Sequence, residues 1–203
     1  MIRNIVFDFG GVLVDWDPRI PYLEAFHGNK EKANWFIETV CNHDWNLQLD
    51  KGLSFDEGIA QLQKIYPDYH DEIALYKTKW PEMLIGPKLE VVNILRALCA
   101  TDNYHMFAIT NWSAETFPIA ERQYEFFRWF EDIVVSGKIS MIKPNEDIFQ
   151  YSLNRFQIKA EESVFIDDNI LNIKTARDLG FRAIHFIDSS NLISELEQLN
   201  VHY

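Results

Sequence analysis

Polar residues that could carry out chemistry lie at or just beyond the ends of short apolar runs at four places in this chain. They are Asp8, the pair Thr110 and Asn111, Lys143, and the pair Asp167 and Asp168. Carboxylates that lie close together repel each other unless a cation joins them, and Mg²⁺ prefers such hard oxygen ligands. A lysine and neutral donors beside them suit a phosphoryl group that a carboxylate attacks to form an aspartyl-phosphate. The residue types therefore predict phosphoryl chemistry if the fold brings the four places together.

The first of these places combines a strand pattern with two glycines. Residues 5–7, Ile-Val-Phe, are typical of a strand buried on both faces, as in a parallel sheet. Asp8 follows directly, and Gly10 and Gly11 allow the backbone to turn sharply and to approach a ligand closely. Because ligands of open α/β sheets bind just outside the carboxyl ends of the strands, we expect Asp8 to lie where chemistry occurs.

The elements that must position these residues begin at Gly86, where strand and helix patterns alternate. We predict helices over 87–99, within 114–127, over 145–156 and over 169–179, a last helix capped by Ser190, and strands over 105–109, 132–135, 163–166 and 183–186. Strands that alternate with helices imply a parallel sheet with right-handed crossovers. The strand ends of such a sheet meet at one rim, so the pattern predicts an α/β fold with the four polar places along that rim.

Residues 16–85 show helical periodicity with many aromatic residues, and we predict about four helices there. Ser54 and Glu57 fit a capping box at the start of one helix. We therefore expect an α/β core domain over 1–15 and 86–203 and a helical cap domain over 16–85. The cap leaves the core at the edge that carries Asp8, which suggests a lid over the site. Trp45 lies between two cap helices, where core packing is the favoured role and a place in a substrate pocket the alternative.

Composition restricts the classes of partner. The net charge is -12, from 31 acidic and 19 basic residues, so no basic surface is available for nucleic acid. No apolar run approaches the ~18 residues of a membrane span, and no signal-peptide pattern is present, so we expect a cytoplasmic protein away from membranes. Cys41 and Cys99 lie in apolar helical patterns and are expected to be buried, reduced thiols.

Taken in order, four motifs give the whole chain a resemblance to the haloacid dehalogenase (HAD) superfamily of hydrolases. The motifs are Phe7–Leu13, Ile109–Asn111, Lys143–Pro144, and Phe165–Asn169 with Asn172 after it. The helical insert resembles a subclass I cap. The Gly-Gly turn and the Asp-Asp-Asn run look most like bacterial alpha-D-glucose-1-phosphate phosphatases and their relatives. The resemblance implies a Rossmann-like parallel core with an inserted helical bundle.

The resemblance also implies a role for each motif residue. Asp8 would be the nucleophile and a Mg²⁺ ligand, and Lys143 the second catalytic residue. The carbonyl of Gly10 and the carboxylate of Asp168 would complete the protein ligands, with Asp167 a ligand through water or a partner of Lys143. Thr110, the amide of Asn111 and Lys143 would bind the phosphoryl oxygens.

One position departs from the family pattern. Phosphatases of this superfamily usually carry a second aspartate two residues after the nucleophile, which acts as general acid and base, and here that position is Gly10. Such assistance is commonly worth ~10²–10⁴ in rate. The residues that could replace it are Asp15, Asp17, His43, Asp44 and Asp50.

The expected function is that of a Mg²⁺-dependent phosphatase acting on a small phosphorylated metabolite, with a sugar phosphate as the expected substrate. One alternative is a 2-haloacid dehalogenase, in which Asp8 displaces halide from carbon without a metal. The paired carboxylates Asp167 and Asp168 argue against it, because they would repel an anionic substrate. The other alternative is a phospho-ligand-binding protein that lost turnover with the acid/base.

Overall fold

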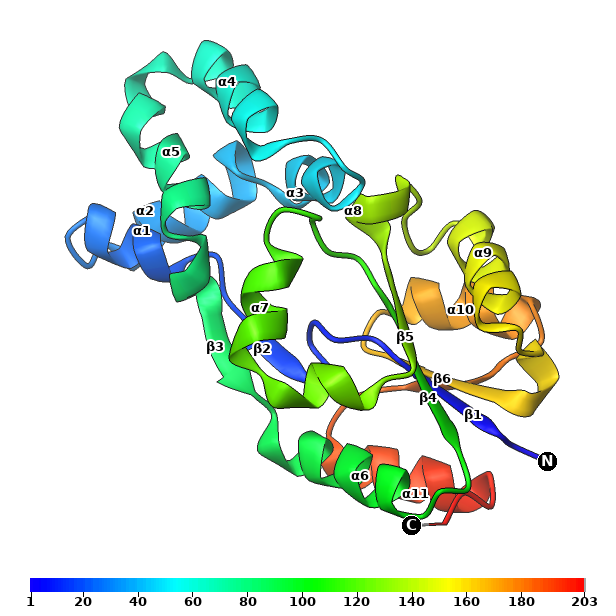
Figure 1. Cartoon of the computed structure of the whole chain (residues 1–203). Coiled ribbons are helices and arrows are strands. Elements are labelled where there is room, and N and C mark those ends of the chain that lie inside the picture. Colours follow the sequence, from blue (N-terminus) through cyan, green and yellow to red (C-terminus); the bar gives the residue numbers. More distant parts are fainter. Residues whose placement is uncertain (203) are drawn as a thin grey trace.

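The computed structural model describes residues 1–202 and is built on a five-stranded parallel sheet (Figure 1). The strand order across the sheet is β5 (Asp132–Val135), β4 (His105–Thr110), β1 (Asn4–Phe7), β6 (Ser163–Asp167) and β7 (Arg182–His185). Every neighbouring pair is parallel, and Phe7 at the end of β1 lies opposite Ala108 of β4 and Ile166 of β6. The predicted parallel α/β fold is therefore confirmed.

Helices cover both faces of this sheet. On one face lie α6 (Leu89–Ala100) and α11 (Ser189–Gln198), and on the other α9 (Glu146–Phe156) and α10 (Ile170–Asp178) (Figure 1). Within β1, Ile5 and Phe7 belong to the core cluster on the α6 side, while Val6 belongs to the cluster on the α9 side. Successive strand residues point to opposite faces, so a strand covered on both sides is apolar throughout.

Shorter elements complete the core. They are α7 (Phe117–Gln123), a 3₁₀ turn over Glu125–Trp129, and α8 (Ser136–Ile139). Phe9 packs beneath the loop after β1, stacked on Phe127 with ring centroids 4.2 Å apart. The carbonyl of Phe9 also accepts the N–H groups of Leu13 and Val14 at 2.8 and 2.9 Å. The stacking on Phe127 and the hydrogen bonds to the Phe9 carbonyl therefore fix the loop that carries Asp8.

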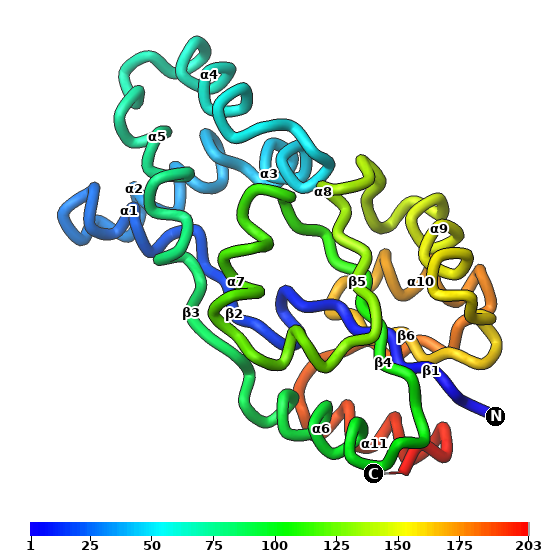
Figure 2. Tube along the Cα trace, in the orientation of Figure 1, coloured from blue at the N-terminus to red at the C-terminus, as the bar shows by residue number. Residues whose placement is uncertain are grey.

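Residues 17–83, called here the helical segment, leave the core after β2 (Val14–Trp16) and return at β3 (Leu84–Pro87). The segment contains α1 (Ile20–Ala25), α2 (Lys30–Trp35) with a π-helical turn over Phe36–Val40, α3 (His43–Asp50), α4 (Phe55–Ile65), α5 (His70–Thr78), and 3₁₀ turns over Pro67–Tyr69 and Trp80–Met83. Figure 2 shows the outgoing and returning chain side by side at the base of this group of helices. Five α-helices thus occupy the region where about four were expected.

The pairing of β2 with β3 corrects the expected order of elements at both ends of the segment. The two strands are antiparallel, with Val14 opposite Pro87 and Asp15 opposite Gly86. We expected no strand between residues 16 and 85, and we expected Pro87 near the start of a helix, which in fact begins at Leu89. Strands of three and four residues are too short to give an alternating pattern, and β3 also contains glycine and proline. The division into core and cap domains stays a prediction.

Two helix caps and one cysteine also differ in detail from expectation. Ser54 accepts the N–H of Glu57 at 3.2 Å, but the Glu57 carboxylate accepts from the Ser54 hydroxyl instead of reaching its N–H. The last helix is capped by Asp188, which accepts the N–H of Asn191, and not by Ser190, because the carboxylate lies one residue before the first turn. Both cysteines are free, as expected, but Cys99 is only partly buried.

No helix within residues 1–202 combines the length and apolar character needed to cross a membrane.

Candidate active site

Three neighbouring strands deliver the predicted site residues to one rim of the sheet. Asp8 directly follows β1, Thr110 ends β4, and Asp167 ends β6. The backbone N–H of Asp8 donates to the carbonyl of Ile166 at 2.9 Å, which ties the loop after β1 to the neighbouring strand. Because the three strands are parallel and adjacent, residues far apart in the sequence become neighbours here.

Lys143 is buried in the middle of this rim. Its Nζ lies 2.9 Å from Oδ2 of Asp8 and 2.7 Å from Oδ2 of Asp167, and it donates to the carbonyl of Ile109 at 2.8 Å. Only 2% of the residue is exposed, so the ammonium is held almost entirely by protein groups. Lys143 therefore lies between the two carboxylates, and its side chain does not point into bulk solvent.

The side chain of Asn111 fixes the backbone of Lys143. Its Nδ2 donates to the carbonyl of Lys143, and its Oδ1 accepts the N–H of Lys143, both at 2.9 Å. The carboxamide thus positions the lysine, so the backbone N–H of Asn111 is the group that could serve a phosphoryl oxygen. Thr110 is fully buried, and its hydroxyl has no hydrogen-bond partner among the described residues. Buried polar groups normally have a partner, so this hydroxyl has an unused hydrogen bond, although Thr110 does not line the cavity described below.

The charges at the rim do not balance. Burial raises the pKa of Asp8 to about 7, and although Lys143 opposes this shift, Asp167 and Asp168 add to it. Burial acts to lower the pKa of Lys143, but Asp167 and Asp8 outweigh it and raise that pKa above its ordinary value. Three carboxylates therefore share one ammonium, and the site favours a second cation.

The three carboxylates are placed to hold such a cation. One oxygen from each of Asp8, Asp167 and Asp168 lies within 4.8 Å of the others. Gly11 permits this arrangement, because it has φ +73° and a Cβ there would lie 2.1 Å from Oδ2 of Asp168. Asn172 donates to both oxygens of Asp167, at 2.9 and 3.0 Å, and so fixes its orientation. Hard oxygen ligands in this number fit Mg²⁺.

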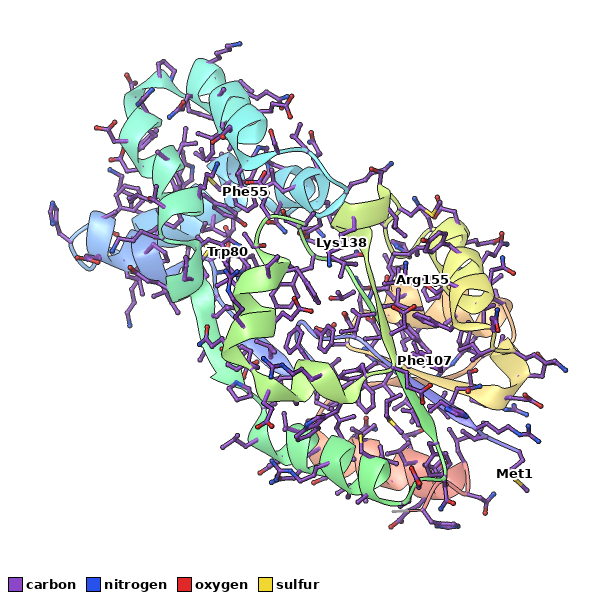
Figure 3. The ribbon with its side chains drawn as sticks, viewed as in Figure 1. Met1, Phe55, Trp80, Phe107, Lys138 and Arg155 are labelled. Carbon is purple, nitrogen blue, oxygen red and sulfur yellow. The ribbon has the colours of Figure 1, made fainter. Side chains whose placement is uncertain are left out.

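A cavity of about 380 Å³ opens above the rim and is lined by both parts of the molecule. The core contributes Asp8, Gly10, Gly11, Asn111, Trp112, Ser113, Thr116, Lys143, Asp168, Asn169 and Asn172. The helical segment contributes Phe55 and Trp80, labelled in Figure 3, together with His43, Asn46, Leu47 and Asp50. The remaining lining residues, Val14, Asp15 and Trp16, come from β2. A ligand at the rim would therefore be enclosed by the helices as well.

The five residues considered as replacements for the missing acid/base differ in their surroundings in the structure. Asp15 is 2.6 Å from Nζ of Lys88, and Asp17 is 2.7 Å from a nitrogen of Arg19. Asp44 is exposed and lines a neighbouring cavity, not the one above the rim.

His43 and Asp50 do line the cavity above the rim, together with Asn46. Asn46 was not among the residues considered, although positions 43, 46 and 50 share one face of a helix. This spacing is the sequence signal that could have found it.

Trp45 packs in the core of the segment, with Nε1 donating to the carbonyl of Gly58 at 3.2 Å, so the packing role is the correct one.

The fold and the rim together define an α/β protein with an acidic, lysine-bearing site at the carboxyl ends of a parallel sheet. The family model of haloacid dehalogenase-like hydrolases matches residues 5–186. The chain therefore belongs to this family and is an enzyme of the hydrolase class. This confirms the resemblance drawn from the four motifs, while the finer likeness to glucose-1-phosphate phosphatases stays a prediction.

Curated relatives match most of the chain. A sesquiterpene phosphatase of Aspergillus oryzae is 26% identical over 199 residues, which is 97% of this chain and 96% of the relative. A D-ribitol-5-phosphate phosphatase of Bacteroides thetaiotaomicron is 26% identical over 196 residues, covering 89% of this chain and 90% of the relative. A drimenol cyclase of Aspergillus calidoustus is 25% identical over 189 residues, but the chain spans only 34% of its length.

Solved structures share the fold. A HAD-like hydrolase from Porphyromonas gingivalis is 25% identical, with a TM-score of 0.74 and all of both chains covered. A HAD family enzyme from Bacteroides thetaiotaomicron, solved with magnesium and inorganic phosphate, is 22% identical, with a TM-score of 0.70 and 95% and 99% of the two chains covered.

Proposed function

We propose that this enzyme is a Mg²⁺-dependent phosphatase that hydrolyses a small phosphorylated metabolite, with a sugar phosphate as its substrate. The observation that carries the proposal is the position of Lys143, within 2.9 Å of Asp8 and 2.7 Å of Asp167, beside the third carboxylate of Asp168. A carboxylate nucleophile, a fixed cation and a set of hard oxygen ligands are the parts that phosphoryl transfer through an aspartyl-phosphate requires.

Each residue of the rim has a task in this proposal. A carboxylate oxygen of Asp8 attacks phosphorus, and the bond to the leaving oxygen breaks. Nζ of Lys143, the hydroxyl of Thr110 and the backbone N–H of Asn111 hold the phosphoryl oxygens, where the transition-state charge spreads. Asp8, Asp168 and the carbonyl of Gly10 would hold Mg²⁺, which supplies further positive charge to the phosphoryl group, and Asp167 keeps Lys143 in place.

The helical segment acts as a cap in this proposal, with residues 16–85 forming the cap domain. Hydrogen bonds attach it to the core beside the cavity, for example at Phe55 and at Asp50. The N–H of Phe55 donates to Oε1 of Glu115 at 2.8 Å, and the hydroxyl of Ser136 donates to the carbonyl of Asp50 at 2.5 Å. Closing the cavity excludes water while Asp8 attacks, and opening it releases the dephosphorylated product.

The relatives support a phosphatase and bear on the substrate class. The names of two relatives describe one enzyme as acting on D-ribitol 5-phosphate and the other as a sesquiterpene phosphatase. The cavity of about 380 Å³ has apolar lining residues such as Leu47, Phe55 and Trp80, and polar ones such as Asn46, Asn111 and Asn172. The polar residues could bind the hydroxyl groups of a polyol phosphate. We therefore favour sugar and polyol phosphates over terpenyl phosphates.

A phosphatase screen tests the proposal. Purified protein is assayed on sugar, polyol and terpenyl phosphates, with Mg²⁺ and with EDTA, and Asp8→Asn is the variant. We expect turnover that needs Mg²⁺, is greatest on a sugar or polyol phosphate, and is lost in Asp8→Asn. Turnover that survives EDTA, or that persists in the variant, would overturn the assignment. Thermal stabilisation by phosphate and Mg²⁺ without turnover would instead identify a binding protein.

A further inference from the structure

The proposed reaction needs a proton donor that the rim does not contain. The leaving oxygen of an alkyl phosphate must be protonated as its bond to phosphorus breaks, and water must lose a proton when it attacks the aspartyl-phosphate. Asp8 and Asp167 are paired with Lys143, Asp168 belongs to the cluster that favours a cation, and position 10 is glycine. A general acid and base must therefore come from the opposite wall of the cavity.

We compared the carboxyl groups of that wall by whether a basic side chain pairs with them, and Asp50 at the end of α3 is the candidate that remains. Asp15 and Asp17 are both ion-paired, and Asp44 lines a different cavity. Within residues 1–202, no basic side chain forms an ion pair with Asp50, although it lines the same cavity as Asp8. His43 also lines this cavity but is exposed at the surface.

A short hydrogen-bond chain holds the Asp50 carboxyl group in place. The hydroxyl of Tyr76 donates to Oδ1 of Asn46 at 2.8 Å, and Nδ2 of Asn46 donates to Oδ2 of Asp50 at 2.9 Å. The Tyr76 hydroxyl thus occupies the amide oxygen of Asn46, and the amide N–H group of Asn46 faces Asp50. The hydrogen bond from Ser136 to the Asp50 carbonyl then fixes this end of α3 to the core.

We propose that Asp50 is the general acid and base of this phosphatase, taking the part that an aspartate at position 10 plays in most of its family. The inference depends on the proposed function. In the first step the carboxyl proton of Asp50 passes to the leaving oxygen as the P–O bond breaks and the bond from Asp8 to phosphorus forms. In the second step the Asp50 carboxylate takes a proton from water, whose oxygen attacks phosphorus and releases Asp8.

The surroundings of Asp50 suit a group that must gain and lose a proton. Burial raises its pKa to about 7, and hydrogen bonds from the Ser113 backbone and Asn46 only partly oppose the shift. A carboxyl group is an efficient general acid when its pKa lies near the working pH. The other titratable groups nearby are Tyr76 on α5, His43 on α3, Asp15 on β2, and Asp8, Lys143 and Asp168 at the rim.

A leaving-group comparison tests the inference, with Asp50→Asn as the variant and Asp44→Asn as the control from the same helix. The substrates are the best alkyl phosphate from the screen above and p-nitrophenyl phosphate, whose phenolate leaves without a proton. In single-turnover measurements of leaving-group release, we expect Asp50→Asn to slow the first step by about 10²–10⁴ with the alkyl phosphate and by less than about tenfold with p-nitrophenyl phosphate. The second step, hydrolysis of the aspartyl-phosphate, should slow equally with both substrates. Wild-type kcat on the alkyl phosphate should fall above about pH 7, and this limb should vanish in Asp50→Asn.

A second variant adds the family's usual aspartate to the defective enzyme. A Cβ at Gly10 would meet nothing within 4 Å, so Gly10→Asp can be combined with Asp50→Asn. We expect the double variant to hydrolyse the alkyl phosphate at least about tenfold faster than Asp50→Asn does, because the aspartate at position 10 restores a general acid. Equal losses of the first-step rate on both substrates, or no loss on either, would overturn the inference while leaving the phosphatase intact. A wild-type protein that hydrolyses neither substrate would remove the proposed function itself.

Discussion

The two walls of the cavity hold their carboxyl groups in opposite ways. At the rim, Asp8 and Asp167 lie within 2.9 Å of the Lys143 ammonium. Strand ends fix the two carboxylates, and Asn111 fixes the backbone of Lys143. On the helical wall, Asp50 is held by the neutral amide of Asn46, with its burial uncompensated by a cation. Burial raises the pKa of both Asp8 and Asp50 to about 7, so the two differ in their partners and not in their pKa. A carboxyl group paired with a fixed cation suits a nucleophile beside a metal site, whereas a buried carboxyl group without a cationic partner suits proton transfer. The difference indicates that attack and proton transfer are assigned to different parts of the chain.

Removing the Lys143 ammonium from the rim should have the largest effect on stability and activity. Lys143→Met leaves Asp8 and Asp167 buried without their partner, and breaking such a pair commonly costs ~3–5 kcal/mol. We expect urea unfolding to show a loss of this size at pH 7, a smaller loss at pH 5, and no detectable turnover. Lys79 is the matched control, because it is partly exposed and its ion-pair partner within residues 1–202 is Glu82. Lys79→Met should change stability by less than ~0.5 kcal/mol. A loss below about 1 kcal/mol in Lys143→Met would mean that the rim does not depend on this ion pair.

The next largest effect should follow from filling the space beside Asp168. An alanine at Gly11 takes on a positive φ, at a cost of ~1–2 kcal/mol, and pushes the Asp168 carboxylate from its place. We expect Gly11→Ala to weaken Mg²⁺ binding about 10–100-fold by calorimetry, as disturbed metal ligation commonly does. Gly28 has a similar φ of +82° but open space around it, so Gly28→Ala should share the strain and keep the Mg²⁺ affinity. Equal affinity in both variants would contradict a metal role for Asp168.

The rim could be predicted from sequence because its geometry follows from the sheet. Once strands and helices alternate, parallel pairing brings the residue after β1 next to the last residues of β4 and β6. The positions of Asp8, Thr110 and Asp167 needed no knowledge of side-chain packing. The Asn111 clamp on the Lys143 backbone did escape prediction, because the same side chain could equally have faced the substrate.

The helical wall could not be predicted in the same way. Helical periodicity showed which faces are apolar, but not how α3 turns toward the rim, which depends on contacts such as that from Ser136 to the Asp50 carbonyl. Two of the competing carboxyl groups, Asp15 and Asp17, were excluded by their ion pairs with Lys88 and Arg19, and Asp44 was excluded because it lines a different cavity. The β2–β3 pair was missed because so short a strand leaves no periodic pattern.

A functional acid on the helical wall should cost the folded protein stability. Burial raises the pKa of Asp50 from 3.8 to about 7, so between these values the folded state binds the proton more tightly than the unfolded state. As pH rises through that range, the stability contributed by protonated Asp50 is therefore lost, and the free energy of unfolding falls by up to ~1.4 kcal/mol per pH unit. Asp50→Asn cannot ionise, and we expect urea unfolding without Mg²⁺ to show it roughly 1–2 kcal/mol more stable than wild type at pH 8. This advantage should disappear at pH 4.

Asp44→Asn again serves as the control, because Asp44 is exposed. Its stability should follow that of the wild type at both pH values. An Asp50→Asn protein that is less stable than the wild type at pH 8 would show that the carboxylate is a structural anchor, and the contrast between the two walls would fail.

The smallest effect concerns the contact that joins the two walls. Glu115, in the loop after β4, accepts the N–H of Phe55 at the start of α4 with one oxygen and lies 3.7 Å from Lys77 with the other. Glu115→Ala removes an acceptor from a helix N-terminus, which commonly costs ~1 kcal/mol, whereas Glu115→Gln keeps an acceptor and removes only a partly exposed charge. We expect urea unfolding to show about 1 kcal/mol for the alanine variant and a few tenths for the glutamine variant. Equal losses would assign the contact to the ion pair with Lys77, and it should then weaken in high salt.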